Sequence, residues 1–352
     1  MPFVNLSFLQ DFETRAKLIT VDAYQRMAAN LWIWDFMVSK KTESRKEVLS
    51  WLLSTAQIEE IGEGGGAMNF DAMEQALAEF TTKHHGKGLE ISRDQFEDLD
   101  GNGIEVGAEW MKQIGAYMAY YPQKLGVAAL KAGHSAGSTG YDGEIFFSAS
   151  HPNNPNNVAK GVYANLFTGA ASGSYPGALP IDTSVSVEVA FANLQKAIAY
   201  IRGIKGPNGE DPRFLRPLKM LVAPTNMGRA VQLTNATFIA QAATGGAGGG
   251  DVDAVVKAMA LVQPVVADEL DGFESGTTYF LGCQDVSSTE IGGLVHIERK
   301  PFEINYYSGQ GGGGATGVDA ALARQQTFEW HCRGRMAAGY GHPYELHKIK
   351  AS

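Results

Sequence analysis

The chain has 352 residues and a mass of 37.8 kDa, above the size at which a single hydrophobic core usually stops growing, so we expect two or more domains. Its formal net charge of −9 argues against a surface that coats nucleic acid, because such a surface is normally basic. Two cysteines, Cys283 and Cys332, are too few for a disulfide framework and predict buried thiols in a reducing compartment. No apolar run reaches the ~20 residues that span a bilayer, and no secretory signal is present, so we expect a soluble intracellular product without a membrane partner.

The first third of the chain predicts an arm and a hairpin. Residues 1–38 have helically spaced apolar residues and end in three aromatics, Trp32, Trp34 and Phe36, which need a partner surface on this subunit or another. Residues 39–95 predict a strand at 48–53, a glycine cluster at 62–66, a short helix at 68–80 and a returning strand at 81–96. Two extended arms with little core of their own predict a reach toward a neighbour.

Residues 91–132 contain the longest helical pattern. Its predicted apolar face comprises Ile104, Ala108, Met111, Ile114, Met118, Tyr121, Leu125 and Ala128. Pro122 lies inside this pattern and removes one backbone donor, so we expect a kink, or a break and restart of the helix. A helix of this length would act as a strut on which other layers lean.

The rest of the chain predicts a hairpin strand and then α/β structure. A short strand is expected at 144–148, between glycine-rich and Asn-Pro loops. Helices are expected at 187–201, 224–232, 252–259 and 318–323, and strands at 218–222, 262–267, 278–283, 294–299, 302–307, 325–338 and 344–349. Further glycine clusters lie at 245–250 and 309–314. This order suggests a second domain inserted between the central helix and the C-terminal strands.

Two motifs resemble catalytic or metal sites. Residues 133–137 form G-x-S-x-G around Ser135, but the motif follows a helix and enters a loop, the reverse of the strand-turn-helix context that a serine hydrolase needs. Asp98, Asp100, Asn102 and Glu109 match a calcium-binding loop, although Glu105 occupies a position that is usually apolar and no second such loop exists. The alternative is an acidic turn at the start of the central helix, where carboxylates are favourable.

Other chemical patterns are weaker. Gly309, Gly311 and Gly314 form G-x-G-x-x-G, but too few residues follow for a dinucleotide-binding fold. The adjacent pairs His84–His85 and His331–Cys332 lie in extended segments, so their side chains would point to opposite faces and could not share one metal. No catalytic residue, metal ligand or cofactor is therefore predicted beyond the calcium-loop candidate.

Six segments in order resemble the Mu-type major head subunit of tailed bacteriophages, a branch of the Hong Kong 97-type capsid fold. They are ISRDQFED (91–98), YDGEIFFSASHP (141–152), LKMLVAPTNMGRAVQL (218–233), PVVADEL (264–270), TYFLGC with ERKPFEI (278–283 and 298–304) and RMAAGYG (335–341). The resemblance implies an α+β fold with an N-terminal arm at 1–40, an E-loop hairpin at 41–95 and a peripheral domain with a long spine helix at 96–158. An axial α/β domain at 159–300 and C-terminal strands at 301–352 complete it.

The implied function is that of a major capsid protein, not an enzyme. Hexamers and pentamers would self-assemble into an icosahedral shell in the host cytoplasm, and the shell would enclose double-stranded DNA without sequence-specific binding. A separate scaffolding protein, a portal and decoration proteins would be partners. Within the same fold, an encapsulin-like compartment remains an alternative, and a serine hydrolase using Ser135 is the alternative of another class.

Overall fold

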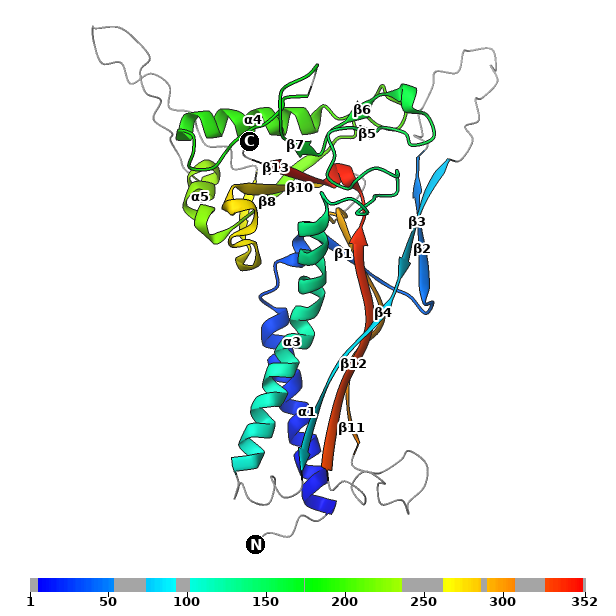
Figure 1. Cartoon of the computed structure of the whole chain (residues 1–352), viewed down its shortest axis with the longest axis vertical. Helices are drawn as coiled ribbons and strands as arrows, with labels where there is room; N and C mark the ends of the chain where they lie inside the picture. The colour runs from blue at the N-terminus through cyan, green and yellow to red at the C-terminus, as the bar shows by residue number, and fades with distance from the viewer. Residues whose placement is uncertain are drawn as a thin grey trace, which may run out of the picture.

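The computed structural model describes residues 6–53, 74–92, 102–173, 175–235, 262–285, 290–307 and 327–350. It combines an elongated part, built from two long helices and long strands, with a compact part at one end of them (Figure 1). No helix among the described residues is both long and apolar enough to cross a membrane. The mixed helix and strand content confirms the expected α+β class.

The elongated part is a four-stranded sheet with two helices along one face. Its strands lie in the order β1 (Met37–Lys41), β11 (Leu294–Tyr307), β12 (Thr327–Tyr340) and β4 (Lys83–Ser92), with β1 parallel to β11 and the other pairs antiparallel. Helix α3 (Asn102–Ala132) packs on this sheet through Met111 and Ile114, which meet Trp330 and Cys332 of β12. Helix α1 (Leu6–Ala28) packs along α3.

The compact part is a five-stranded sheet in the order β7 (Leu166–Phe167), β13 (Leu346–Lys350), β10 (Thr278–Gln284), β8 (Arg216–Val222) and β9 (Gln263–Val266). Helices α4 (Val187–Arg202) and α5 (Met227–Asn235) bury Ala197, Ile201 and Leu233 in its core. The Ser186 hydroxyl caps α4 by accepting from the Val189 amide, so the helix begins where the serine stands. Because β13 is the last strand, the C-terminus completes this sheet.

Smaller elements connect the two parts. Strands β5 (His151–Pro152) and β6 (Val162–Tyr163) pair with each other, as do β2 (Lys46–Leu52) and β3 (Gln75–Thr81). Short 3-10 helices lie at Ile33–Asp35, Val158–Lys160, Pro224–Asn226, Asp268–Leu270, Phe273–Gly276 and Pro343–Glu345.

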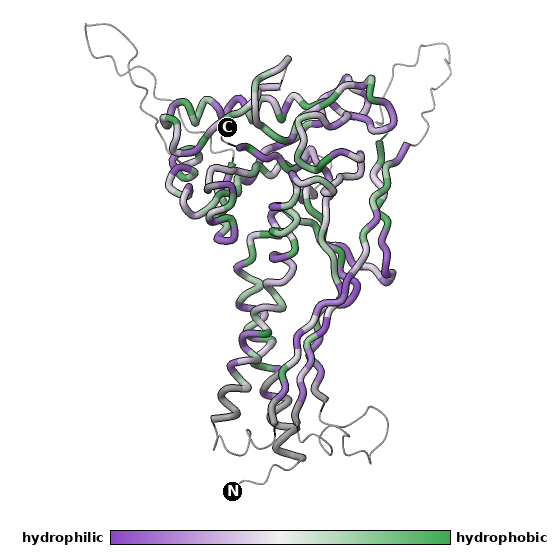
Figure 2. Tube along the Cα trace, in the orientation of Figure 1, coloured by the Kyte–Doolittle hydropathy of each residue, from purple (hydrophilic) through white to green (hydrophobic). Residues whose placement is uncertain are grey.

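The β2–β3 hairpin corrects one prediction. We expected a helix at 68–80, but residues 75–80 belong to β3, which pairs antiparallel with β2. Hydrophobic and hydrophilic residues alternate along this hairpin in Figure 2, and Ala76 and Phe80 are buried while Leu77 and Glu79 are exposed. Helix-forming residues such as alanine and leucine suggested the helix, but pairing with β2 outweighs that local propensity.

Helix α3 continues through Pro122, so the break and restart that we allowed for is wrong, while a kink at Pro122 stays a prediction. Before Pro122, Met111 and Ile114 of the predicted apolar face are buried. After Pro122, Val127 and Leu130 are buried, whereas Ala128, which we expected on the buried face, is exposed. The buried face of the helix shifts because Ile33 packs against Gly126. The contact is so close that a Cβ at position 126 would lie 2.9 Å from the Ile33 side chain.

Most other predicted elements are confirmed, with two exceptions. The strands expected at 294–299 and 302–307 are one strand, β11, whose register shifts around Lys300 next to Pro301. Residues 144–148 form no strand; a single bridge joins Thr139 to Ile145. The expected helices at 252–259 and 318–323 and the three glycine clusters lie outside the described residues.

The contact between α1 and α3 depends on Gly115. A Cβ at this position would lie 2.5 Å from the Thr20 carbonyl oxygen. We expect Gly115→Ala to destabilise the chain by about 1–3 kcal/mol despite its better helix propensity, because the two backbones cannot separate freely. Gly228→Ala in α5, where a Cβ meets nothing within 4 Å, is the matched control and should be neutral or stabilising. Urea unfolding of the unassembled chain measures both, and equal effects of the two variants would contradict the prediction.

Candidate functional site

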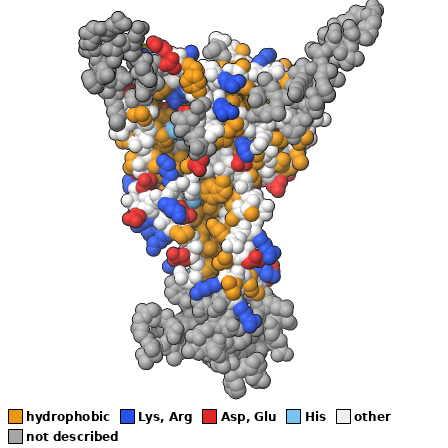
Figure 3. All heavy atoms as spheres, turned by 180° about the vertical axis from the view of Figure 1, so that it is seen from behind, with side chains coloured by type: hydrophobic (Ala, Val, Ile, Leu, Met, Phe, Trp, Pro, Cys, Tyr) orange, Lys and Arg blue, Asp and Glu red, His pale blue; other side chains and the backbone are white. Residues whose placement is uncertain are grey.

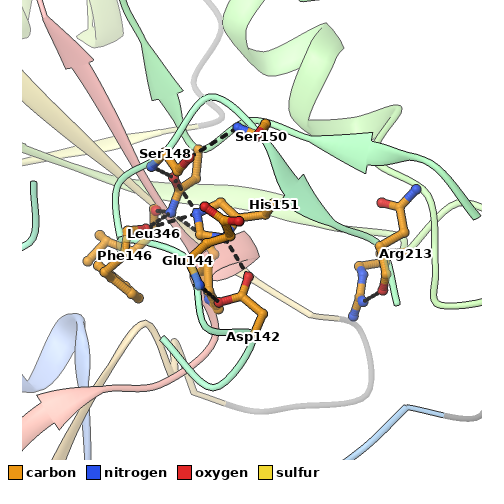
Figure 4. Close-up of polar contacts among 11 residues, drawn as sticks. Asp142, Glu144, Phe146, Ser148, Ser150, His151, Arg213 and Leu346 are labelled. Atoms are coloured by element: carbon orange, nitrogen blue, oxygen red, sulfur yellow. Dashed lines mark hydrogen bonds and ion pairs between the residues drawn. The ribbon is translucent and has the colours of Figure 1, made fainter. Parts of the chain in front are cut away.

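A buried contact between an acid and a histidine lies where the elongated and compact parts meet. Asp142 stands in the tight turn after α3, and His151 begins β5. The Asp142 Oδ2 atom lies 2.6 Å from His151 Nδ1, and the two side chains are 2% and 0% exposed (Figure 4). Gly143, which follows Asp142 in this turn, has a φ of +82°, a value that glycine adopts without strain.

Asn165 lies on the other side of the His151 ring. His151 Nε2 lies 3.1 Å from both the Phe146 carbonyl oxygen and Asn165 Oδ1. Both ring nitrogens of His151 therefore lie within hydrogen-bond distance of oxygen atoms, and the ring is held on both sides. The Asn165 amide nitrogen donates to the carbonyl oxygens of Phe146, Pro343 and Leu346, at 2.6, 3.0 and 3.3 Å. We call Asp142, His151 and Asn165 the polar latch, because they join the turn after α3 to β5 and to the start of β13.

A second cluster joins the hairpin to the compact part. Trp51 of β2 stacks on Tyr141 with ring centroids 4.9 Å apart and meets His342 edge-on at 5.6 Å. The Arg213 guanidinium lies 3.9 Å from the ring centroid of the neighbouring Tyr344, a cation–π contact. These contacts fix one end of the hairpin to residues that flank the polar latch.

Glu345 is an ionisable group that this packing affects strongly. Burial, with the nearby charge of Asp285, raises the pKa of Glu345 to about 8, although the Gly292 amide donates a hydrogen bond to its carboxyl. Its side chain is 2% exposed. At neutral pH this carboxyl is therefore largely protonated inside the cluster.

The hairpin has one buried face and one exposed apolar face. Leu49, Ala76 and Phe80 face inward, where Leu49 and Phe80 pack with Val295 and Ile297 of β11. On the outer face, Val48, Leu52 and Leu77 are 53%, 61% and 55% exposed. Large apolar side chains grouped on a projecting element are typical of a surface that another chain covers.

The calcium-loop candidate lies only partly within the described residues. Asp98 and Asp100 lie outside the described residues, Asn102 begins α3, and exposed Glu109 pairs with Lys112 at 3.3 Å. Calcium binding at this loop stays a prediction; the described residues contain no group of acidic, histidine or cysteine side chains that could hold a metal.

The G-x-S-x-G motif follows α3 and enters a turn, so the strand-turn-helix of a hydrolase is missing there. The neighbouring His134 directs Nδ1 to the Phe147 carbonyl oxygen, 3.1 Å away, and not to Ser135. The G-x-G-x-x-G glycines lie outside the described residues.

In each of the pairs His84–His85 and His331–Cys332, the two side chains lie on opposite faces of the long sheet, as predicted. His85 Nδ1 meets the Tyr121 hydroxyl of α3 at 2.7 Å, whereas His84 accepts from Arg335 on the other face. Cys332 packs toward α3, and His331 faces away, 3.0 Å from Glu329. The described cysteines, Cys283 and Cys332, are buried and unbonded to each other, as expected.

Sequence reasoning missed the polar latch. The segment YDGEIFFSASHP supplied part of the resemblance through its Asp-Gly and His-Pro pairs, but their pairing was not predicted. The available signal was an acid and a histidine that flank two adjacent phenylalanines, Phe146 and Phe147, both fully buried. Burial of the two phenylalanines brings the acid and the histidine at the two ends of this short segment close together.

Breaking the polar latch should be costly. Asp142→Asn replaces the buried carboxylate whose Oδ2 lies 2.6 Å from His151 Nδ1 by an amide, which fits the ring less well, so we expect a loss of about 1–3 kcal/mol. Asp22→Asn, which breaks the exposed Asp22–Arg26 pair of 2.9 Å, should cost at most ~0.5 kcal/mol. Urea unfolding of the unassembled chain compares the two, and a loss below ~1 kcal/mol for Asp142→Asn would show that the pair is dispensable.

Glu345 should make stability depend on pH. Its folded-state pKa of about 8 lies above the ordinary value of 4.5, so its contribution is full below pH 4.5 and is lost as the pH rises through about 8. Glu345→Gln keeps the shape without the titration. Relative to this variant, the natural chain should lose roughly 3–5 kcal/mol of stability between pH 5 and pH 9. Parallel pH curves for the two chains would refute this assignment.

Comparisons with known proteins agree with this architecture. The family model described as phage capsid protein matches residues 76–349. The capsid protein of cyanophage P-SCSP1u superposes with a TM-score of 0.53 at 15% identity, covering 90% of this chain and 87% of that one. The bacteriophage JBD30 capsid gives 0.51 at 18% identity, covering 68% and 91%, and its form decorated with minor capsid protein trimers gives 0.51 at 16%, covering 70% and 92%. No curated protein matches the chain in sequence.

These likenesses confirm the expected Hong Kong 97-type capsid fold, while the finer placement in the Mu-type branch stays a prediction. The family model covers more than three quarters of the chain and includes the polar latch, the five-stranded sheet up to residue 349, and three of the four strands of the long sheet. The chain belongs to the phage capsid protein family.

Proposed function

We propose that this chain is the major head subunit of a tailed bacteriophage and assembles into hexamers and pentamers of an icosahedral shell around double-stranded DNA. The observation that carries the proposal is the projecting hairpin with its exposed Val48, Leu52 and Leu77, together with the family membership. An apolar face of this kind gains stability only when a neighbour covers it. The protein would therefore be located in the virion after assembly in the host cytoplasm.

Further exposed apolar surface supports contact between many copies. Leu18, Val21 and Tyr24 of α1 are all more than 40% exposed. The face in Figure 3 carries a band of hydrophobic side chains down its middle, between scattered charged groups. Several small contacts of this kind suit a closed shell, because copies in slightly different surroundings can adjust each contact independently.

The resemblance assigns each part a place in the shell. The N-terminal arm (1–40) and the peripheral domain (96–158) would correspond to the elongated part, the E-loop (41–95) to the hairpin and β4, and the axial domain (159–300) to the compact part. Strand β13 within the five-stranded sheet supports C-terminal strands (301–352) that complete the other domains. Strand β11 runs across the proposed boundary at residue 300, so this boundary lies within one element.

The remaining partners are proposed on the same basis. A separate scaffolding protein and a portal would guide closure, and decoration proteins would bind the finished shell. The JBD30 structure decorated with minor capsid protein trimers supports decoration on this fold. The net charge of −9 suits a shell wall that encloses DNA without binding it tightly. The role that we propose is structural and not enzymatic.

Electron microscopy of the purified chain tests the proposal directly. Coexpression with a cognate scaffold should yield uniform closed shells. Shells that hold DNA support the phage head, and shells that hold a protein cargo would favour the encapsulin-like compartment. A small species that forms no shell, and whose esterase activity is abolished by Ser135→Ala, would overturn the proposal.

The outer hairpin face should be needed for assembly and not for folding. Leu52→Gln with Leu77→Gln removes apolar area that the isolated subunit leaves in water, so we expect unfolding free energies to change by less than ~0.5 kcal/mol. The yield of closed shells should fall by about tenfold or more, because each subunit loses part of one interface. Leu52→Met with Leu77→Met is the matched control and should assemble normally. Normal shells from the glutamine variant would rule out this face as an interface.

A further inference from the structure

A cavity of about 270 Å³ lies between α3 and β4, the last strand in the order of the four-stranded sheet. Helix α3 contributes Ile114, Met118 and Tyr121 to its lining, and Phe302 of β11 and Cys332 of β12 add further apolar surface. Walls of apolar and aromatic side chains favour an apolar occupant over water. We call this cavity the α3–β4 pocket.

The Phe302 ring reaches the α3–β4 pocket because Gly334 of β12 has no side chain. A Cβ at Gly334 would lie 2.8 Å from the ring, so Phe302 crosses β12 at that glycine. The ring then meets the Tyr121 ring edge-on, with centroids 5.5 Å apart. The two rings form one wall of the pocket and offer a packing surface to another aromatic ring.

Hydrogen bonds hold the His85 side of the pocket in place. His85 Nδ1 lies 2.7 Å from the Tyr121 hydroxyl, and its Nε2 lies 3.3 Å from the Met336 carbonyl oxygen. Since a carbonyl oxygen only accepts, Nε2 donates, and in a neutral ring Nδ1 accepts from the Tyr121 hydroxyl. These bonds fix both rings relative to α3 and β12, so the pocket is formed before any ligand enters.

Two exposed lysines place positive charge at the mouth of the pocket. Lys87 lines the pocket and is the cross-strand partner of Cys332, so both side chains leave the sheet on the face that carries α3. Lys124 Nζ donates to the Tyr117 hydroxyl at 2.7 Å and lies 5.4 Å and 6.0 Å from the ring centroids of Tyr117 and Tyr121. The described residues that line the pocket include no acid. The mouth therefore favours an anionic group, and the interior favours a ring.

We propose that the α3–β4 pocket binds a small aromatic carboxylate of one or two rings. The ring lies against Phe302 and Tyr121, and the carboxylate faces the ammonium groups of Lys87 and Lys124. The volume is slightly below the ~300 Å³ at which pockets for drug-sized ligands begin, which limits the ligand to about two rings. A ligand that contacts both α3 and β4 stabilises the elongated part, because it binds only the folded chain. This inference concerns the single subunit and does not depend on the proposed shell.

Naphthalene-2-carboxylate and the uncharged naphthalene-2-methanol test the proposal on the unassembled chain. Isothermal titration calorimetry should show saturable binding of the carboxylate with a dissociation constant of about 0.1–1 mM, as expected for a ligand of this size. At about ten times that constant, the midpoint of thermal unfolding should rise by about 2 °C. The alcohol should bind about tenfold more weakly, because the lysines do not attract it.

Removal of the two positive charges should separate the two molecules. Lys87→Gln with Lys124→Gln should weaken binding of the carboxylate about tenfold and change that of the alcohol by less than about twofold. Lys160→Gln with Lys196→Gln removes two exposed charges from the compact part and is the matched control. An equal loss in the control would show that total charge attracts the ligand, and would overturn the proposal.

Filling the pocket should abolish binding of both molecules. Met118 is partly buried in the lining, and Met118→Trp places a larger side chain there, with circular dichroism to show that the variant folds. If it does not fold, photocrosslinking of benzophenone-4-carboxylate to the natural chain locates the site, and the labelled peptides should contain residues 84–87 or 114–121. Unchanged binding in a folded Met118→Trp chain, labels elsewhere, or no saturable binding to the natural chain would overturn the proposal. A failure to form shells would instead contradict the proposed function.

Discussion

The arrangement of the whole subunit depends on one buried contact between an acid and a histidine. Asp142 and His151 are almost completely removed from water, and their contact compensates for the lost hydration only because the other polar atoms of the cluster also have partners. Asn165 supplies those partners and reaches the backbone at Pro343 and Leu346. Because the cluster joins the turn after α3 to β13, it sets how the elongated part meets the compact one.

Around this fixed junction, the subunit leaves several surfaces without partners. The hairpin is anchored at one end through Trp51 and exposes apolar side chains on its outer face, and α1 exposes Leu18, Val21 and Tyr24. Neither arrangement is favourable in an isolated molecule. Both become favourable when copies meet, so the fold separates a rigid interior from surfaces whose stability comes from assembly.

The sequence predicted the elements that have strong periodicity or clear end signals. Helix α3 and helix α4 are examples, as are the buried strands β8 and β10. It failed where distant pairing decides the structure. Residues 75–80 are good helix formers that become a strand because β2 lies beside them. The polar latch joins residues nine to twenty-three positions apart through a turn, and no local pattern encodes that geometry. Pro122 interrupts the helical pattern in the sequence, but packing before and after it keeps helix α3 continuous.

The family match begins at residue 76, so it includes β3 and the polar latch but not β2. The hairpin therefore combines one strand from the part of the chain that resembles other capsid proteins with one strand outside that part. Leu77 lies in β3, whereas Val48 and Leu52 lie in β2. The outer hairpin face could then change through β2 alone, while the interior determines where that hairpin is presented.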